Sequence, residues 1–168
     1  MMAISAQDVA RLREETSAGM LDCKKALEES GGDFQKAKEQ LKKKGFAAAA
    51  KRAERATAEG MIASYIHHNS RYGSLVEVNC ESDFVARTDA FQELAQQVAL
   101  HIAAAGPLYL SQEEMPAGSA DAPKDVVLLL QPYVKDESRT IQDLVTETSA
   151  TTGENVRIRR FARFELGR

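Results

Sequence analysis

One segment of this chain, residues 76–87 (VEVNCESDFVAR), limits its possible folds most, because it predicts a strand that passes directly into a helix. Apolar and polar residues alternate from 76 to 80, which is typical of a strand with one buried face. Ser82 or Asp83 then supplies a side-chain oxygen that can cap the start of a helix. The fold must therefore contain a sheet with helices beside it, and Phe84 stands where the two meet.

The junction at residues 80–84, called the corner below, has two possible uses. Local rules favour Asp83 as the helix cap and Phe84 as a core residue beneath the sheet. In the alternative, Phe84 stays exposed on a rigid corner and reaches into a partner protein. The two uses differ in whether the ring of Phe84 is buried.

Residues 1–45 predict a small module of three helices. The second helix is expected over Met20–Ser30, because two glycines follow it. Asp33 is placed to cap the third helix, and Gly45 is expected to close it. Residues 46–58 follow as a basic helical connector, since four consecutive alanines favour a helix there.

Residues 59–168 predict a separate core domain. Two strand-like runs, 61–68 and 74–80, are joined by a short turn that contains glycine, and this pattern predicts a hairpin. The second run is the strand that leads into the corner. The sheet of this domain therefore begins with an antiparallel pair.

Helices and one more strand complete the core domain. The spacing of apolar residues predicts a long helix over 88–105 and a shorter one over 141–151. Apolar residues alternate with charged ones from 156 to 166, as in a half-buried strand, whereas 116–124 has the composition of a loop. The prediction is an α+β fold, in which a three-stranded antiparallel sheet with helices packed on it follows the three-helix bundle.

Composition indicates a protein of the cytoplasm. A chain of 168 residues is long enough to bury a core without disulfides, and its two cysteines, Cys23 and Cys80, lie far apart in the sequence. The start of the chain has no apolar signal run, and no segment is long enough to span a membrane. The net charge of −3 argues against nucleic-acid binding by overall electrostatics.

The sequence offers no support for catalysis. It contains neither the GxSxG pattern of serine hydrolases nor the glycine-rich patterns that bind nucleotide phosphates. His67, His68, His101 and Cys80 are residue types that bind zinc, but the first two are adjacent in a strand and point to opposite faces. We expect no enzyme activity, no metal and no cofactor.

Two features leave alternatives open. From Lys36 to Arg55 eight basic residues accompany two acidic ones, which gives this segment a charge of +6. This segment is either a solvated helix face or a surface for an acidic protein, and RNA is the third option, because aromatic residues for base stacking are nearly absent. Met20 and Leu21 begin the second helix, where Met20 either packs on the third helix or contacts a partner.

Three segments resemble the signatures of the elongation factor Ts family. They are residues 16–27 (TSAGMLDCKKAL), residues 76–87, and residues 153–161 (GENVRIRRF). The resemblance covers essentially the whole chain, and the segments occur in the family's order. Ser17, Leu21 and Ser82 depart mildly from the family pattern, and Ser82 keeps the hydroxyl needed for a cap.

This resemblance implies a guanine-nucleotide exchange factor for elongation factor Tu. It implies that the first module is of the ubiquitin-associated type and docks on the GTPase, and that the corner intrudes beside the site of magnesium and phosphates. It also implies that a histidine of the long helix presses towards the same site. The matching positions are Arg13, Met20 and Leu21 for docking, Asp83 and Phe84 for intrusion, and His101 for the helix histidine.

The resemblance further implies a homodimer, because this chain contains one copy of a core half that long family members have twice. We expect a non-covalent dimer built on the sheet and its last strand. The loop at 116–124 is shorter than the helical insertion of the family. Two other hypotheses remain: an adaptor that binds without altering nucleotide release, and an RNA-binding module that uses the basic segment.

Overall fold

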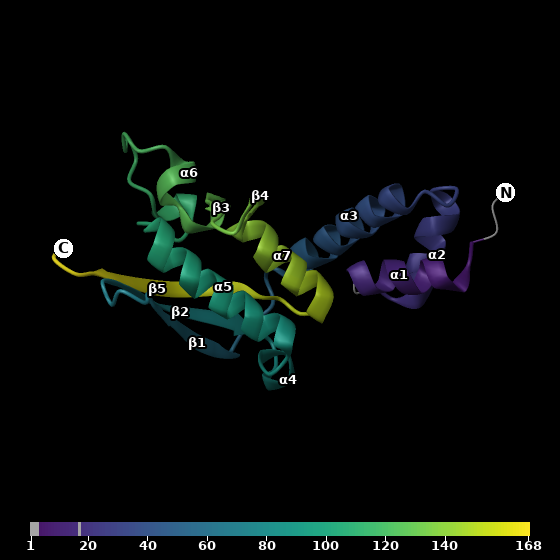
Figure 1. Cartoon of the computed structure of the whole chain (residues 1–168), viewed down its shortest axis with the longest axis horizontal. Coiled ribbons are helices and arrows are strands. Elements are labelled where there is room, and N and C mark those ends of the chain that lie inside the picture. The colour runs from purple at the N-terminus through teal and green to yellow at the C-terminus, as the bar shows by residue number, and fades with distance from the viewer. Residues whose placement is uncertain (1–3, 17) are drawn as a thin grey trace.

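The computed structural model describes residues 4–16 and 18–168. Its first part is a three-helix module made of α1 (Ala6–Thr16), α2 (Met20–Glu29) and α3 (Phe34–Arg52), at one end of the molecule (Figure 1). Asp33 caps α3, as predicted, by accepting hydrogen bonds from the backbone N–H groups of the next turn. A small apolar core holds the three helices together, formed by Val9, Leu12, Cys23, Ala26, Leu27, Ala37 and Leu41.

The predicted end of the third helix at Gly45 is wrong, because α3 continues to Arg52. Glycine weakens a helix by only about 1 kcal/mol relative to alanine, so it does not by itself end one. A Cβ atom at Gly45 would lie 3.1 Å from the Cβ of Ala150, which belongs to α7 (Ile141–Thr152). The glycine therefore permits close contact between α3 and α7, and most of the predicted connector is the last part of α3.

The three-stranded antiparallel sheet is confirmed. It consists of β1 (Glu59–Ile66), β2 (Tyr72–Cys80) and β5 (Arg157–Glu165), in the order β1-β2-β5. The strands β1 and β2 form the predicted hairpin, and the last strand pairs with β2. The central strand is thus the one that leads into the corner.

The last strand contains a bulge that the sequence pattern did not reveal. Glu77 pairs with Arg160 and Val78 pairs with Ile158, so Arg159 is an extra residue in β5. A bulge reverses the faces of the residues that follow it. The predicted single alternation is therefore wrong, since Ile158 is buried in the core whereas Phe164 is exposed on the opposite face.

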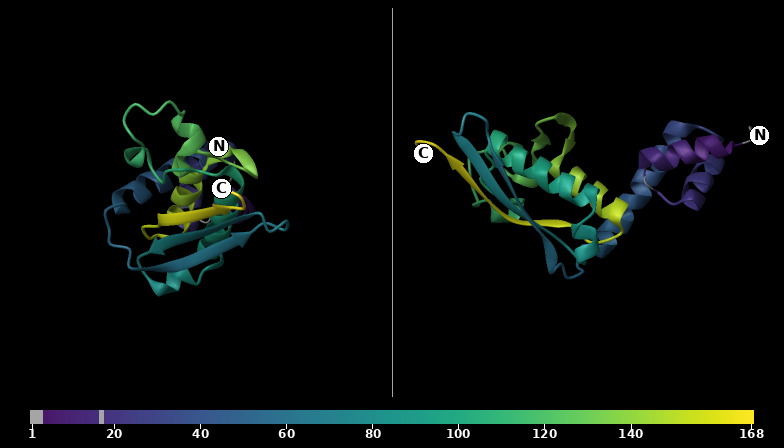
Figure 2. Two further views of the ribbon diagram at one scale, coloured as in Figure 1. Left: turned by 90° about the vertical axis from the view of Figure 1, so that its left-hand side faces the viewer. Right: turned by 60° about the horizontal axis from the view of Figure 1, so that its bottom comes forward.

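One face of the sheet is covered by helices. The long helix α5 (Asp89–Ala105) lies on β1 and β2 and packs against α7 (Figure 2). Thr88 caps α5 at its start, and Gly106 ends it with a left-handed backbone conformation, φ 62°. The core between these elements is apolar and includes Val76, Val78, Phe91, Val98, Ile102 and Leu144.

The segment between α5 and α7 is more ordered than predicted. Residues 116–122 form the expected loop, but α6 (Pro123–Val126) follows it. Short 3₁₀ turns lie at Gln112–Glu114 and Leu128–Leu130, and β3 (Pro132–Tyr133) pairs with β4 (Asp136–Thr140) in a small second sheet. No helix in the described part of the chain is long and apolar enough to cross a membrane.

Candidate partner-binding site

The corner is capped by Ser82, which was one of the two predicted caps. Its hydroxyl accepts a hydrogen bond from the N–H of Val85, at 3.4 Å, and thereby caps α4 (Asp83–Ala86). The local preference for Asp83 as the cap is wrong. Asp83 is instead the first residue of α4, and its carboxylate accepts a hydrogen bond from Arg87 at 2.8 Å. Asp83 is therefore held by Arg87 on the corner while its side chain remains partly exposed.

Phe84 lies on the surface, and the local preference for a core position is wrong. Its exposed fraction is 79%, whereas that of the next residue, Val85, is 8%. A single helical turn can direct only one of these neighbouring side chains into the core, and Val85 occupies that place. The corner thus presents a large aromatic side chain to solvent.

A buried cysteine braces the corner from the sheet side. Cys80 is fully buried, and its thiol donates a hydrogen bond to the carbonyl of Ser82, at 3.1 Å. Burial, together with the nearby negative charge of Glu154, raises the pKa of the Cys80 thiol to about 11. The group is therefore a protonated donor at neutral pH, which suits a structural role.

The three positions of the first module that are predicted to dock on a partner are all exposed. Arg13 lies in the last turn of α1, and Met20 and Leu21 begin α2 just beyond the connecting loop. The exposed fraction is 46% for Met20 and 84% for Leu21. Figure 1 shows α1 and α2 at a distance from α4. The structure therefore carries two separate exposed surfaces.

His101 is not brought together with the corner. It lies on α5, twelve residues after Asp89, which is about 18 Å along the helix axis. Its ring is fully buried, Nδ1 accepts the N–H of Val134, and Nε2 lies 2.9 Å from the side-chain oxygen of Gln131. The helical pattern alone predicts a solvent or backbone partner for His101; the backbone N–H of Val134 is that partner, and the ring faces the core rather than solvent.

The hydrogen bonds of His101 fix its tautomer. Because Nδ1 accepts a hydrogen bond, Nε2 carries the proton and donates it to Gln131. Burial lowers the pKa of His101, and the hydrogen bond with Gln131 offsets this only in part. The neutral ring joins α5 to Gln131 and Val134, the residues on either side of β3.

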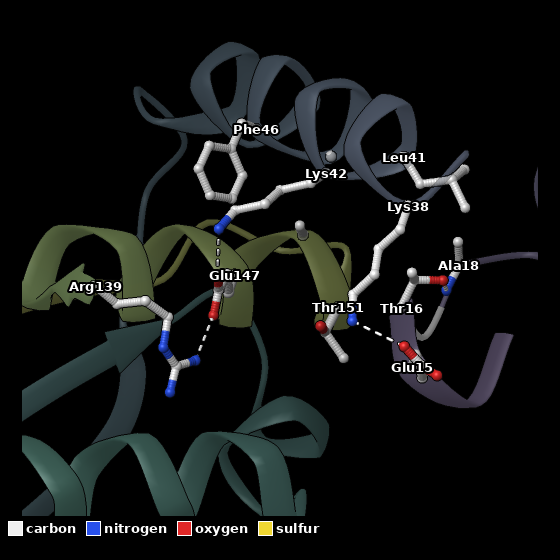
Figure 3. A pocket seen from close by; sticks show the side chains of 12 residues that line it. Glu15, Thr16, Ala18, Lys38, Leu41, Lys42, Phe46, Arg139, Glu147 and Thr151 are labelled. Carbon is white, nitrogen blue, oxygen red and sulfur yellow. Dashed lines mark hydrogen bonds and ion pairs between the residues drawn. The ribbon is translucent and has the colours of Figure 1, made fainter. Parts of the chain in front are cut away.

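A cleft of about 450 Å³ lies where α3 meets α7 (Figure 3). Charged side chains cross it: Lys42 is 3.1 Å from Glu147, and Arg139 is 3.0 Å from the same carboxylate. Lys38 pairs with Glu15 of α1 at 2.8 Å. Of these pairs, Lys42–Glu147 joins the first module to the core domain, whereas Lys38–Glu15 lies within the module. Both pairs neutralise lysines of the basic segment 36–55.

The histidines near the hairpin turn form an aromatic cluster. The prediction that His67 and His68 lie in a strand and point to opposite faces is wrong, because β1 ends at Ile66 and their rings are 4.1 Å apart. Nδ1 of His67 lies 3.1 Å from the hydroxyl of Tyr65. Cys80 and His101 are buried elsewhere in the core. Within residues 4–16 and 18–168, no group of three or more metal-binding side chains is close enough to hold a metal ion.

The sequence analysis missed residues that hold the corner in place. Glu154 was noted only as part of the last family signature, yet its carboxylate contacts both Glu81 and Ser82. These contacts join positions more than seventy residues apart in the sequence. No local pattern signals such a pairing, and only the return of β5 beside β2 brings the two turns together.

Comparisons with known proteins identify the family. The family model described as Elongation factor TS matches residues 5–124. A protein named Elongation factor Ts from Anaeromyxobacter sp. (strain K) is 48% identical over 197 positions, which cover 99% of this chain and 90% of that protein. Its counterpart from Geobacter sp. (strain M21) is 46% identical over 196 positions, with coverage of 99% and 91%.

A third relative has the same name and is covered in full. The Elongation factor Ts of Fervidobacterium nodosum is 44% identical over 196 positions, which cover 99% of this chain and 100% of that protein. These alignments are longer than the 168 residues of this chain, so the relatives contain residues that it lacks. The family match and the near-complete coverage agree: this chain belongs to the elongation factor Ts family.

Proposed function

We propose that this chain releases GDP from elongation factor Tu during translation elongation, by inserting Asp83 and Phe84 beside the site of magnesium and phosphates. Membership of the elongation factor Ts family supports the nucleotide-exchange role. The observation that carries the insertion step is the exposure of Phe84, 79%, on a capped and braced corner. A side chain in this position can enter a partner without rearrangement of the core.

The proposed action needs no covalent chemistry. GDP and its metal ion are held by phosphate contacts, so a side chain that displaces those contacts weakens nucleotide binding. The coupling is reciprocal, because GDP weakens the binding of the exchange factor by the same factor. A coupling of about 3 kcal/mol changes an affinity about 150-fold, which is enough for exchange.

We assign docking to the first module and release to the corner. Leu21 and Met20 are apolar, exposed and adjacent in the sequence, and Arg13 is an exposed charged residue in the last turn of α1. Burial of such side chains contributes about 1.5–3 kcal/mol each to binding. The model of action is therefore a docked module that holds the corner against the GTPase domain.

The release of a fluorescent GDP analogue from elongation factor Tu tests this function. We expect the intact chain to accelerate release, and Phe84→Ala to reduce the acceleration by at least about tenfold while the protein stays folded. Leu108→Ala is the matched control, because Leu108 is also apolar and 62% exposed but lies outside the corner. Binding without acceleration would contradict the proposal and favour an adaptor.

We also propose that two copies of the chain form a non-covalent homodimer through the open face of the sheet. In the described part of the chain no helix covers this face, which carries Ile62, Ile66, Leu75 and Phe164 with exposed fractions of 65%, 67%, 48% and 69%. Cross-strand pairing places Ile66, Gly73 and Phe164 in one row. A second copy would cover this apolar row, and both cysteines are buried, so the contact is not a disulfide.

Sedimentation at micromolar concentration tests the dimer. The intact chain is expected to sediment as a dimer, and Leu75→Asp as a monomer, because a carboxylate on the central strand would be buried without a partner. Leu108→Asp introduces the same charge at an exposed apolar site away from the sheet and should leave the dimer intact. An intact chain that is monomeric and active would overturn this proposal.

A further inference from the structure

The corner is held by the turn between α7 and β5, and Glu154 provides most of the contacts. One carboxylate oxygen accepts the backbone N–H groups of Glu81 and Ser82, both at 3.0 Å. The other oxygen accepts the hydroxyl of Ser82 at 2.6 Å. A single side chain therefore satisfies three donors in the residues that precede Phe84.

The bond to the hydroxyl also controls the cap of α4. The Ser82 hydroxyl gives its hydrogen to Glu154, so its lone pairs are free to accept the N–H of Val85. Without Glu154 the same hydroxyl could rotate and donate elsewhere. Glu154 thus sets the orientation of the first turn of α4, from which the ring of Phe84 projects.

The contact between the two turns is reciprocal. The Glu81 carboxylate accepts the backbone N–H of Asn155, at 2.6 Å. The side chain of Asn155 donates to the carbonyls of Ala53 and Arg55, at 3.0 and 2.8 Å, just beyond the end of α3. The same turn therefore holds the corner on one side and the helix from the first module on the other.

We infer that Glu154 is a positioning residue for nucleotide exchange: it fixes the direction in which Phe84 leaves the corner and, with Asn155, ties that direction to α3. This inference rests on the proposed function. A side chain can displace contacts in a partner only when the backbone that carries it is held rigidly. A corner that is already ordered in the free protein also loses less conformational entropy on binding. The Glu154 carboxylate provides this support, because it accepts hydrogen bonds from three donors of the corner.

Substitutions at Glu154 should separate positioning from charge. Glu154→Ala leaves the two N–H groups and the hydroxyl without their acceptor, and we expect release by saturating exchange factor to slow about tenfold. Glu154→Gln should retain most activity, because its amide oxygen can accept both N–H groups while its nitrogen donates to Ser82. The concentration of exchange factor that gives the half-maximal release rate should be similar for the intact chain and both Glu154 variants, since the proposed docking surface of Met20 and Leu21 is unaltered.

A double-mutant cycle with Phe84→Ala makes the test specific. If Glu154 acts through Phe84, Glu154→Ala causes no further loss of release rate in the Phe84→Ala background. An unchanged rate for Glu154→Ala, or losses that add in the double variant, would overturn the inference. Ser82→Ala offers a milder second variant, expected to lose less and to be masked in the same way, should Glu154→Ala fail to fold.

Amide hydrogen exchange gives an independent readout. The N–H groups of Glu81 and Ser82 should exchange faster in Glu154→Ala than in the intact chain, and Glu154→Gln should restore their protection. Failure of the intact chain to accelerate GDP release would overturn the proposed function, and this inference with it. Acceleration that Glu154→Ala leaves unchanged would overturn the inference alone.

Discussion

Phe84 and Val85 are neighbours in one helical turn, yet their side chains have opposite environments. Val85 contributes to the core, whereas the ring of Phe84 contributes no core contact and remains available for a partner. Burial of an exposed phenylalanine is worth about 1.5–3 kcal/mol. This range matches the typical coupling free energy between two ligands, so one aromatic side chain is sufficient in magnitude.

At His101 we predict a dependence of stability on pH. Protonation of Nδ1 would place a second donor against the N–H of Val134, and the folded-state pKa is lowered by burial. The folded state therefore binds this proton less readily than the unfolded state, so the contribution of His101 is complete above its ordinary pKa of about 6.5 and is lost as pH falls below it.

Urea unfolding of the intact chain and of His101→Gln checks this prediction. The free energy of unfolding should favour the intact chain at about pH 7.5, and this advantage should shrink at about pH 5. Glutamine does not titrate, so the pH dependence of the unfolding free energy of His101→Gln reports only the other titratable groups. An advantage that stays constant or grows towards low pH would contradict the prediction.

The sequence indicated the corner correctly but not the burial of its side chains. Strand alternation and a capping hydroxyl are local signals, and both are confirmed at residues 76–82. The faces of a four-residue helix follow from what packs beneath it, which no local pattern contains. The same reason explains His101, whose partner Gln131 is thirty residues away.

At the scale of elements, α3 is one continuous helix that begins in the first module and ends against the core domain. Its last part packs on α7 through the close contact of Gly45 and Ala150, and Lys42 pairs with Glu147 beside it. Arg52 donates to the carbonyl of Ser149, at 3.2 Å, near the end of α3. These contacts fix the direction in which the module extends.

We predict that Gly45→Leu separates α3 from α7. A leucine side chain has no room beside Ala150, and overpacking of this kind costs about 1–3 kcal/mol of stability. The measurements are thermal unfolding and the radius of gyration from X-ray scattering, which should increase as the module moves away from the core. Ala47→Leu introduces the same side chain on the exposed side of α3 and is the control.

Equal unfolding temperatures and equal radii of gyration for the two leucine variants would contradict the close-contact role of Gly45.

The sequence pattern places a helix end at this glycine, since glycine is common there. It also missed the bulge at Arg159, because a regular alternation from 156 to 166 fits an unbroken strand equally well. Both errors concern the relation between two elements, namely the contact of α3 with α7 and the register of β5 against β2, which a pattern within one element does not contain.

For the molecule as a whole, the α+β architecture was predictable because its signals are periodic and repeated. The hairpin, the long helix α5 and the return of the last strand are all confirmed. The small sheet of β3 and β4 was not predictable, since its strands are too short to show a period. The division into three segments at residues 45 and 58 stays a prediction.

Three surfaces of the molecule are assigned different tasks in this account. We propose that the start of α2 docks on elongation factor Tu, that the corner promotes nucleotide release, and that the open face of the sheet joins two copies of the chain. Each surface is exposed and contains apolar side chains, while the contacts of α3, α7 and the turn at 153–155 connect them. The central claim is that Phe84 acts on nucleotide release rather than on docking.

The rate of GDP release from elongation factor Tu, measured by stopped flow at saturating exchange factor, tests that claim most directly. Saturation removes differences in docking, so the intact chain and Phe84→Ala differ only in the release step. We predict a release rate at least about tenfold lower for the folded Phe84→Ala variant, which corresponds to about 1.4 kcal/mol. Equal release rates at saturation would contradict the account.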